Sequence, residues 1–407
     1  MSGQSELQLP QLMEQVLARN PSLWVTTAAW RAAAQRYPQV ISLDDPMFGL
    51  MLGPGSWGSD EVNSAYTLEA SQKLPWPGKR QLRGDVALAE ASAARFDIGD
   101  TRLRLVEAAK LSFFDYYLVE RELEVNDRNT QIVQEFRDTA DAKYRANQVT
   151  QQDVLQADVD LAELRRRRFE LERSRVVAIA RINTLLHRQA DYPLPDPPAS
   201  LPPTDEAPPA DLLQQLAIGR RPDLAAIDAR IRAEQANVAL AAREFYPDVE
   251  LVGRYDAFWQ EEPLRPMVGM NVNVPIQRER RRAAVREAMF RANQRRAEFE
   301  QQIDTIRNDV QAAYARVVES RRVTELYRQT LLPVAEQNVE SARAGYVAAR
   351  VDFLRLIEAE RQLISLQEAS YEAEADYHRR LAELERLVGG PLPQVPSNEE
   401  VPAPAPQ

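Results

Sequence analysis

Few side chains in this 407-residue chain could do covalent chemistry or hold a cofactor. It contains no cysteine, which removes thiol catalysis and cysteine-based zinc or iron–sulfur sites. The two histidines, His187 and His378, lie near the ends of predicted helices without an obvious nucleophile and carboxylate beside them. No phosphate-binding glycine loop or cluster of metal ligands accompanies them in the sequence. We therefore expect structural histidines, no metal site, no cofactor and no enzyme activity.

Composition indicates a folded, acidic protein. Hydrophobic residues make up 44% and charged residues 28% of the chain, close to the averages of globular proteins. The chain has 51 basic and 61 acidic residues, so its formal net charge is −10. Binding to nucleic acid needs a basic surface, so no nucleic acid partner is expected. No apolar run is long enough for a membrane-spanning helix. The first residues lack the features of a secretory signal, so the chain is either cytoplasmic or a trimmed form of an exported protein.

The chain consists of two similar copies of a unit of about 200 residues. The segment from Arg19 to Leu23 returns as Arg220 to Leu224, at an offset of 201, and Tyr144 to Leu185 matches Tyr346 to Leu387 at an offset of 202. Two proline-rich segments predict a linker and a tail without regular structure. The predicted divisions are repeat 1 at 1–190, the linker at 191–209, repeat 2 at 210–390 and the disordered tail at 391–407.

Each copy reads as a helix, two short strands and a long antiparallel helical hairpin. In the first copy, helices are predicted at 8–37, at 77–145 and from a turn near Asn147 to about 187, because long intervals lack proline. Apolar residues recur from Val154 to Leu185 in alternating steps of three and four, a coiled-coil seam with two arginine interruptions. The predicted fold class is mainly α with a small β part, in two tandem repeats.

The predicted strands have one apolar and one polar face. They cover Pro46 to Leu52, Tyr66 to Leu74, Val249 to Trp259 and Met267 to Val274. An ordinary half-exposed sheet has the same pattern, but four such strands leave two open edges and an apolar face without a helix to cover it. Closure of several chains into a membrane barrel would put the apolar face against lipid and the polar face against water. The expected lumen residues are Glu69, Lys73, Glu250, Arg254, Asp256, Asn271 and Asn273.

The sequence resembles the TolC-like outer-membrane efflux factors over roughly residues 6 to 390. The resemblance is carried by the opening LQLPQLMEQVLARNPSL, the strand-to-helix junction QKLPWPGKRQLRGDVA, the hairpin turns that begin at Tyr144 and Gly345, and the closing LAELERLVGG. The junction Pro77 to Arg80 looks most like the branch that serves heavy-metal cation pumps.

This resemblance implies a homotrimer in which each protomer gives four strands to a twelve-stranded β-barrel in outer-membrane lipid and its long helices to an α-helical periplasmic tunnel. It implies two partners, a periplasmic adaptor (membrane fusion) protein and an inner-membrane RND-type pump. The chain would be the passive exit duct of this tripartite efflux system for metal cations or small toxic molecules. Its expected location is the bacterial outer membrane, extending into the periplasm, with the signal peptide absent from the sequence as given.

The resemblance also assigns roles to residues near the two hairpin turns. In the family, acidic side chains form a ring at the narrowest point of the tunnel, and a ring of carboxylates attracts cations. The matching positions are Asp153 and Gln156 in the first copy and Arg355 and Glu358 in the second. Arg355 departs from the acidic pattern, which puts a double carboxylate ring in doubt and suggests an Arg–Glu pair between subunits that holds the tip shut.

The same turns are expected to bind the adaptor. The residues assigned to this surface are Tyr144, Ala146, Asn147, Tyr346, Ala348 and Ala349. Small residues permit close approach of helices, although alanine is equally explained by helix propensity. Asparagine fits a tight turn because it tolerates the left-handed conformation.

Two further interpretations stay open. Met47, Met51, Met267 and Met270 lie on predicted strands and could be soft copper ligands, but we favour packing against lipid. A soluble coiled-coil scaffold protein that binds partner helices is the alternative function. It explains the missing signal and the seam, but it does not explain amphipathic strands at matching positions of both copies.

Overall fold

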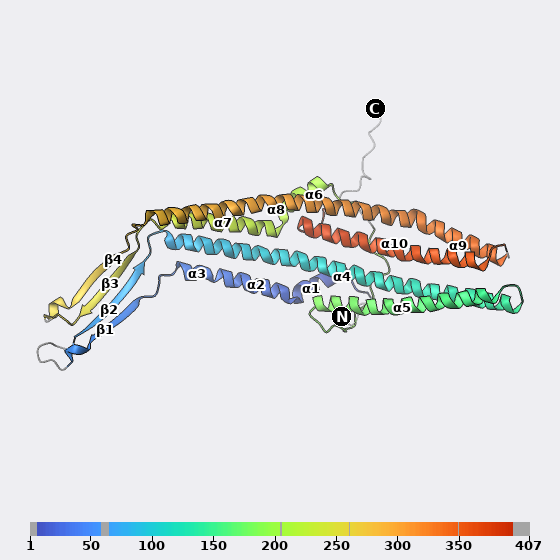
Figure 1. Cartoon of the computed structure of the whole chain (residues 1–407), viewed down its shortest axis with the longest axis horizontal. Coiled ribbons are helices and arrows are strands. Elements are labelled where there is room, and N and C mark those ends of the chain that lie inside the picture. Colours follow the sequence, from blue (N-terminus) through green and yellow to red (C-terminus); the bar gives the residue numbers. More distant parts are fainter. Residues whose placement is uncertain (1–5, 58–64, 204–205, 260, 349, 394–407) are drawn as a thin grey trace, which may run out of the picture. The chain divides into compact units, whose positions relative to one another are not determined.

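The computed structural model describes residues 6–57, 65–203, 206–259, 261–348 and 350–393. Long helices and one small sheet make up the fold (Figure 1). Among the described residues, no helix combines the length and the apolar character that crossing a membrane requires. Contacts divide the chain into two compact units: unit 1 comprises Met1–Leu23, Asp100–Arg221 and Asp304–Gln407, and unit 2 comprises Trp24–Gly99 and Pro222–Ile303. Each unit therefore combines segments from both predicted repeats.

The prediction of one helix over 8–37 is wrong, because this segment forms α1 (Leu9–Arg19), α2 (Pro21–Ala34) and α3 (Arg36–Ile41). The first break is at Asn20, whose backbone is extended. A proline follows it, and a residue before proline is pushed away from the helical conformation. The side-chain oxygen of Asn20 accepts a hydrogen bond from the N–H of Ser22, and its amide nitrogen donates to the carbonyl of Leu185, at 3.0 Å each. These two hydrogen bonds hold the break between α1 and α2 in place.

The long hairpin of the first copy is confirmed as α4 (Lys79–Arg145) and α5 (Gln151–Leu185). The predicted seam on α5 is largely buried, at Val154, Ala157, Leu161, Leu171, Ala178 and Ile182. The two arginine interruptions, Arg168 and Arg175, form ion pairs with Asp127 and Glu120 of α4. Charged side chains therefore continue the helix pairing where the apolar seam is interrupted.

The second half contains α6 (Ala210–Arg220), α7 (Pro222–Arg243), α8 (Arg278–Leu326), α9 (Leu332–Val347) and α10 (Phe353–Val388). A π-helical turn, Tyr327–Leu331, joins α8 to α9 just before Pro333. Proline cannot donate to the carbonyl one turn earlier, and a local widening of the helix removes the resulting clash. The chain therefore continues as one helical arm past this proline.

The proline-rich linker has no helix or strand over 191–203 and 206–209, as predicted. It begins after α5, where the Asn183 amide donates to the carbonyls of Ala190 and Tyr192 at 3.1 and 2.8 Å. The predicted tail falls almost entirely outside the described residues, which end at 393.

The four strands form one antiparallel sheet in unit 2, in the order β1-β2-β3-β4 (Figure 1). They are β1 (Met47–Gly53), β2 (Ala65–Leu74), β3 (Val249–Asp256) and β4 (Pro266–Val272), with short 3₁₀ turns at Pro54–Ser56 and Glu262–Leu264. The central pair, β2 with β3, joins one strand from each sequence repeat. One face of the sheet is apolar and open, with Phe48 81% and Val268 93% exposed.

A buried lysine anchors the junction between β2 and α4. Gly78 has a φ of +91°, which glycine adopts freely, and α4 begins at the next residue, Lys79. The side chain of Lys79 is only 1% exposed, and its ammonium donates to Glu244 (3.3 Å), to the Tyr246 carbonyl (3.2 Å) and to Asp248 (2.9 Å). All three ammonium hydrogens thus have partners on the segment that connects α7 to β3.

We expect Lys79→Met to destabilise unit 2 by about 2 kcal/mol, because hydrogen bonds from a buried cation are lost while the side-chain volume is kept. The measurement is the midpoint of thermal unfolding of the purified protein. Arg95→Met is the matched control, since Arg95 is exposed on the same helix. Equal midpoints for the two variants would show that the lysine does not anchor the junction.

Candidate functional site at the helical hairpin turns

Two tight turns end the helical hairpins of unit 1. In the first, Asn147 takes the predicted left-handed conformation (φ 55°), and its N–H donates to the Tyr144 carbonyl at 2.9 Å. In the second, the N–H of Arg350 donates to the carbonyl of Gly345 at 2.8 Å. A Cβ atom on Gly345 would lie 2.5 Å from the Val351 side chain, so a larger residue there would displace the turn. Sequence reasoning missed this requirement for glycine.

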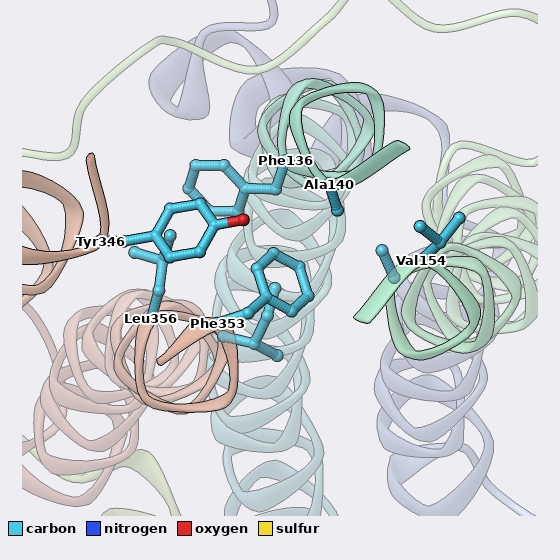
Figure 2. Packing of buried hydrophobic residues seen from close by; sticks show 8 residues of the cluster. Phe136, Ala140, Val154, Tyr346, Phe353 and Leu356 are labelled. Atoms are coloured by element: carbon cyan, nitrogen blue, oxygen red, sulfur yellow. The ribbon is translucent and has the colours of Figure 1, made fainter. Parts of the chain in front are cut away.

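One apolar cluster joins the two turns, and we call the packed end that it forms the tip, residues 136–160, 342–348 and 350–361 (Figure 2). Its buried members are Phe136 and Ala140 of α4, Val154 and Ala157 of α5, Tyr346 of α9, and Phe353, Leu356 and Ile357 of α10. The rings of Tyr346 and Phe353 lie 5.5 Å apart between their centroids. Because all four helices contribute, the hairpins of the two repeats are packed into one end.

A cation–π contact ties the first hairpin to the second. The Lys143 ammonium lies 3.7 Å from the centroid of the Tyr346 ring and donates to the Tyr346 carbonyl at 3.2 Å. Burial, and after it the negative charge of Asp153, raises the pKa of the Tyr346 hydroxyl. Tyr346 therefore stays neutral at physiological pH and packs as an aromatic ring under a cation.

The four residues predicted at the constriction differ in exposure. Asp153 and Gln156 are half-buried on α5, where Asp153 accepts a hydrogen bond from the Thr150 hydroxyl at 3.3 Å. Arg355 and Glu358 are exposed on α10. Neither of these two has an ion-pair partner among the residues that the structure describes, so both are free to meet a neighbouring molecule. A ring at the narrowest point of a tunnel stays a prediction.

Sequence reasoning missed two buried carboxylates in the tip. Asp160 forms an ion pair with Arg361 of α10, and its carboxylate also accepts a hydrogen bond from the side-chain amide of Gln156 at 3.3 Å. Glu360 is only 3% exposed, and burial raises the pKa of its carboxyl, an effect that the positive charge of Arg343 partly offsets. Within the described chain, one oxygen of each carboxylate, Oδ2 of Asp160 and Oε2 of Glu360, has no hydrogen-bond partner.

A cavity of about 250 Å³ between α4, α5 and α10 is lined by both of these carboxylates. Its apolar wall includes Val133, Leu164 and Ile357. Buried, incompletely paired acids next to empty space weaken the packing of these helices at neutral pH. In the sequence, the available signal is that Asp160 and Glu360 directly adjoin apolar positions of the helix seams.

The structure places the residues assigned to an adaptor unevenly. Tyr144, Ala146, Asn147 and Ala348 are exposed at the turns. Tyr346 requires a correction, because it is buried in the apolar cluster and supports the turn from inside. Ala349 lies outside the described residues. Exposed apolar side chains that the sequence analysis did not assign lie beside these turns: Leu155, Val347 and Leu354.

The polar face of the sheet in unit 2 is a second candidate surface. Residues that lie opposite each other in an antiparallel pair share a face. The register puts six of the predicted lumen residues on one face: Glu69, Lys73, Glu250, Arg254, Asp256 and Asn271. Glu69 and Arg254 form an ion pair, with 3.0 Å between Nε and Oε2, and Ser71 donates to Glu250 at 2.9 Å. Asn273 lies one residue beyond the end of β4.

The register also corrects the interpretation of the methionines. Met47, Met51 and Met267 lie opposite Ser71, Thr67 and Arg254, on the polar face. Met270 lies opposite Leu251, on the apolar face. Packing against lipid therefore fits Met270 alone.

The two histidines lie in different environments. His187 follows the end of α5 in a left-handed conformation (φ 53°). His378 lies inside α10 and is 7% exposed, so the expectation that both lie near helix ends is wrong for this residue. A search of the described residues finds no group of three or more His, Cys, Asp or Glu side chains that could hold a metal ion.

Comparisons with known proteins agree with this architecture. The family model described as "Outer membrane efflux protein" matches residues 213–390. The chain is 26% identical to the pyoverdine export outer membrane protein OpmQ of Pseudomonas putida, over 94% of this chain and 84% of that protein. It is also 26% identical to the cobalt-zinc-cadmium resistance protein CzcC of Cupriavidus metallidurans, over 75% of this chain and 72% of that protein.

Solved structures share the fold. The outer-membrane channel OprN superposes with a TM-score of 0.78 at 23% identity, covering 94% of this chain and 90% of that one. That structure therefore shares the fold of long helical hairpins with a small antiparallel sheet. These matches confirm the resemblance to the TolC-like outer-membrane efflux proteins that the sequence indicates. These are channels and not enzymes.

We expect Glu360→Gln to raise the midpoint of thermal unfolding at pH 8 and to have little effect at pH 4. The folded-state pKa of this carboxyl lies above its unfolded value, so stability is fully present below the unfolded pKa and is lost as the pH rises through the folded pKa. A neutral amide does not incur this loss. Glu358→Gln, exposed and two residues away on α10, is the matched control, and a gain of the same size in the control would contradict the role of burial.

Proposed function

We propose that this outer-membrane efflux protein is the exit duct of a tripartite efflux system and works as a homotrimer. The observation that carries the proposal is the open apolar face of the sheet, on which Phe48, Leu50, Val268 and Met270 are all more than half exposed. The opposite face holds the ion pair of Glu69 and Arg254. A sheet with one apolar and one charged face suits a wall between lipid and water.

The edges of the sheet support closure with other copies. Among the residues that the structure describes, β1 pairs with β2 alone and β4 with β3 alone, so one edge of each outer strand is available. Unpaired edges in lipid are costly, and a closed barrel removes them. Three copies would give twelve strands. Trp57 and Trp259, both exposed, follow β1 and β3 at the same end of the sheet, a position suited to a membrane interface.

The tip is the proposed docking surface for a periplasmic adaptor, which would connect the duct to an inner-membrane RND-type pump. Exposed apolar residues flank both turns, at Leu155, Val347 and Leu354. Exposed apolar side chains close to small ones, Ala146 and Ala348, fit the apolar stripe of a partner helix.

The proposed cargo is metal cations or small toxic molecules, conducted passively. CzcC is named for resistance to cobalt, zinc and cadmium, and OpmQ is named for the export of pyoverdine. Exposed Glu358 at the tip would favour cations. The alternative of a soluble scaffold is disfavoured, because it leaves the apolar face of the sheet in water.

The experiment that tests this proposal is the mass of the detergent-solubilised protein by light scattering, followed by conductance in a planar lipid bilayer. A trimer that inserts and conducts is the expected result. A folded monomer that stays in solution without detergent would overturn the channel proposal in favour of the scaffold.

For the constriction, we expect Glu358→Ala to lower the preference for cations in single-channel recordings, because a threefold ring loses three carboxylates. The measurement is the reversal potential in a potassium chloride gradient. Glu336→Ala is the control, since Glu336 is an exposed carboxylate on α9, before the second turn. Unchanged selectivity in Glu358→Ala would remove this residue from the constriction.

A further inference from the structure

A cluster of arginines lies where the sheet of unit 2 meets its helices. The segment 278–286, at the start of α8, contains five arginines and one glutamate, a net charge of +4 in a chain whose formal net charge is −10. Four of these arginines fall within the first five residues of α8. The amino end of a helix carries a partial positive charge, so cations are unfavourable there. Positive charge is therefore concentrated here at a local cost to the helix.

The contacts of Arg281 place this cluster at the end of the sheet. Its Nε donates to the Glu244 carbonyl at 2.6 Å, and Glu244 lies five residues before β3 begins at Val249. The preceding residue, Arg243 of α7, is exposed, and its guanidinium lies 5.7 Å from the centroid of the Tyr246 ring. Figure 1 shows α7 and α8 reaching the sheet at this end. Two separate helices thus bring cations to one junction.

Two arginines of the cluster are exposed and lack an acidic partner. Glu279, the one carboxylate in the first turn of α8, forms its ion pair with Arg282. Arg278 and Arg280 have no ion pair with any residue that the structure describes, and both are exposed. A guanidinium presents several donors in one plane, which matches the oxygens of a phosphate group. The cluster is therefore suited to a phosphate-bearing partner.

Exposed apolar side chains adjoin these arginines. The chain between β4 and α8 carries Val274 and Ile276, which are 66% and 83% exposed. They follow the exposed apolar residues of β4, Val268, Met270 and Val272. Arginine lays its apolar stem on hydrocarbon and keeps its charge in water, so apolar residues beside arginines suit the boundary between lipid tails and headgroups. The partner that fits both features is a lipid.

The length of the strands puts the arginines at the depth of lipid headgroups. β2 has ten residues, or about 34 Å along the strand, and a tilt of about 45° reduces its height to about 24 Å. The apolar band of a membrane barrel is about 25 Å tall. Because Trp57 and Trp259 lie at the opposite end of the sheet, they suit one membrane interface and the arginines suit the other.

We propose that Arg278 and Arg280, together with Arg243 and Arg281, bind the phosphate groups of anionic phospholipids in the leaflet on the helix side of the membrane. Basic residues next to a membrane segment attract anionic lipids. The bound headgroups hold the leaflet at the level where the sheet passes into the helices. This proposal rests on the proposed function, because it takes the apolar face of the sheet to be covered by lipid.

Carboxylates of a neighbouring copy are the competing partners. Asp44 and Asp45 are exposed just before β1, at the same end of the sheet. They would approach the arginines if β1 of one copy pairs with β4 of the next. Two carboxylates leave part of the charge of four guanidinium groups without a counter-charge, so lipid phosphate is favoured.

The test is a titration of the detergent-solubilised protein with dioleoylphosphatidylglycerol or dioleoylphosphatidylcholine, read by native mass spectrometry. The two lipids share their acyl chains, and only the first has a net negative charge. We expect tighter binding of the anionic lipid to the wild type. The double variant Arg278→Gln with Arg280→Gln should bind it at least fivefold more weakly, since one basic residue contributes a factor of about five. Its affinity for the neutral lipid should be unchanged.

The matched control is Arg291→Gln with Arg296→Gln. It removes the same charge from two exposed arginines about 20 Å further along α8, and it should bind both lipids as the wild type does. Equal affinity of the wild type for the two lipids, or an equal loss in the control, would overturn the proposal.

The same spectra report the number of chains in the assembly. Loss of the trimer in Arg278→Gln with Arg280→Gln, with unchanged affinity for the anionic lipid, would assign these arginines to a neighbouring copy and overturn the lipid site. A wild type that is not trimeric would contradict the proposed function and this proposal with it. A trimer that binds both lipids equally would contradict this proposal alone.

Discussion

The pairing of β2 with β3 is the contact on which the sheet depends, because it joins strands from the two sequence repeats. Leu74 lies opposite Val249 at one end of this pair, and Thr67 opposite Asp256 at the other. This register puts Leu68, Leu74, Val249, Leu251 and Tyr255 on one face and all the charged side chains of the two central strands on the other. A shift of β2 by one residue would bring Glu69 to the face that carries Leu251 and Tyr255. The amphipathic wall thus follows from one register.

The helices that leave this sheet are held by a small number of buried polar groups. Lys79 fixes the start of α4 against the segment before β3, with each of its hydrogens bonded. Trp76 stacks on Tyr246 in the same junction, with 5.2 Å between ring centroids. A fully satisfied buried cation gives a defined geometry, because any displacement leaves a donor without a partner. The direction in which the strand passes into the helix is therefore specified.

The tip combines interactions that stabilise its packing with buried groups that destabilise it. Its apolar cluster and the contact of Lys143 with Tyr346 hold the hairpins together, whereas the unpaired oxygens of Asp160 and Glu360 oppose the same packing. Favourable and unfavourable terms therefore coexist among the same four helices. Segments that must rearrange are drawn from regions of low local stability. The buried acids give the tip such a lowered stability.

The sequence by itself determined the hairpins, the strands and the turn at Asn147, because helix and strand periods and the absence of proline act locally. It also determined which side chains share a strand face, since that alternation needs no tertiary contact. It failed at Asn20, where proline and a side-chain cap break a predicted helix, and at Tyr346, whose burial depends on helices far apart in the chain. The tertiary structure alone decided the burial of Glu360 and His378 and the position of Met47 opposite Ser71. Each of these features depends on which segments pack together in the folded chain, and the sequence of one segment does not show which other segments it contacts.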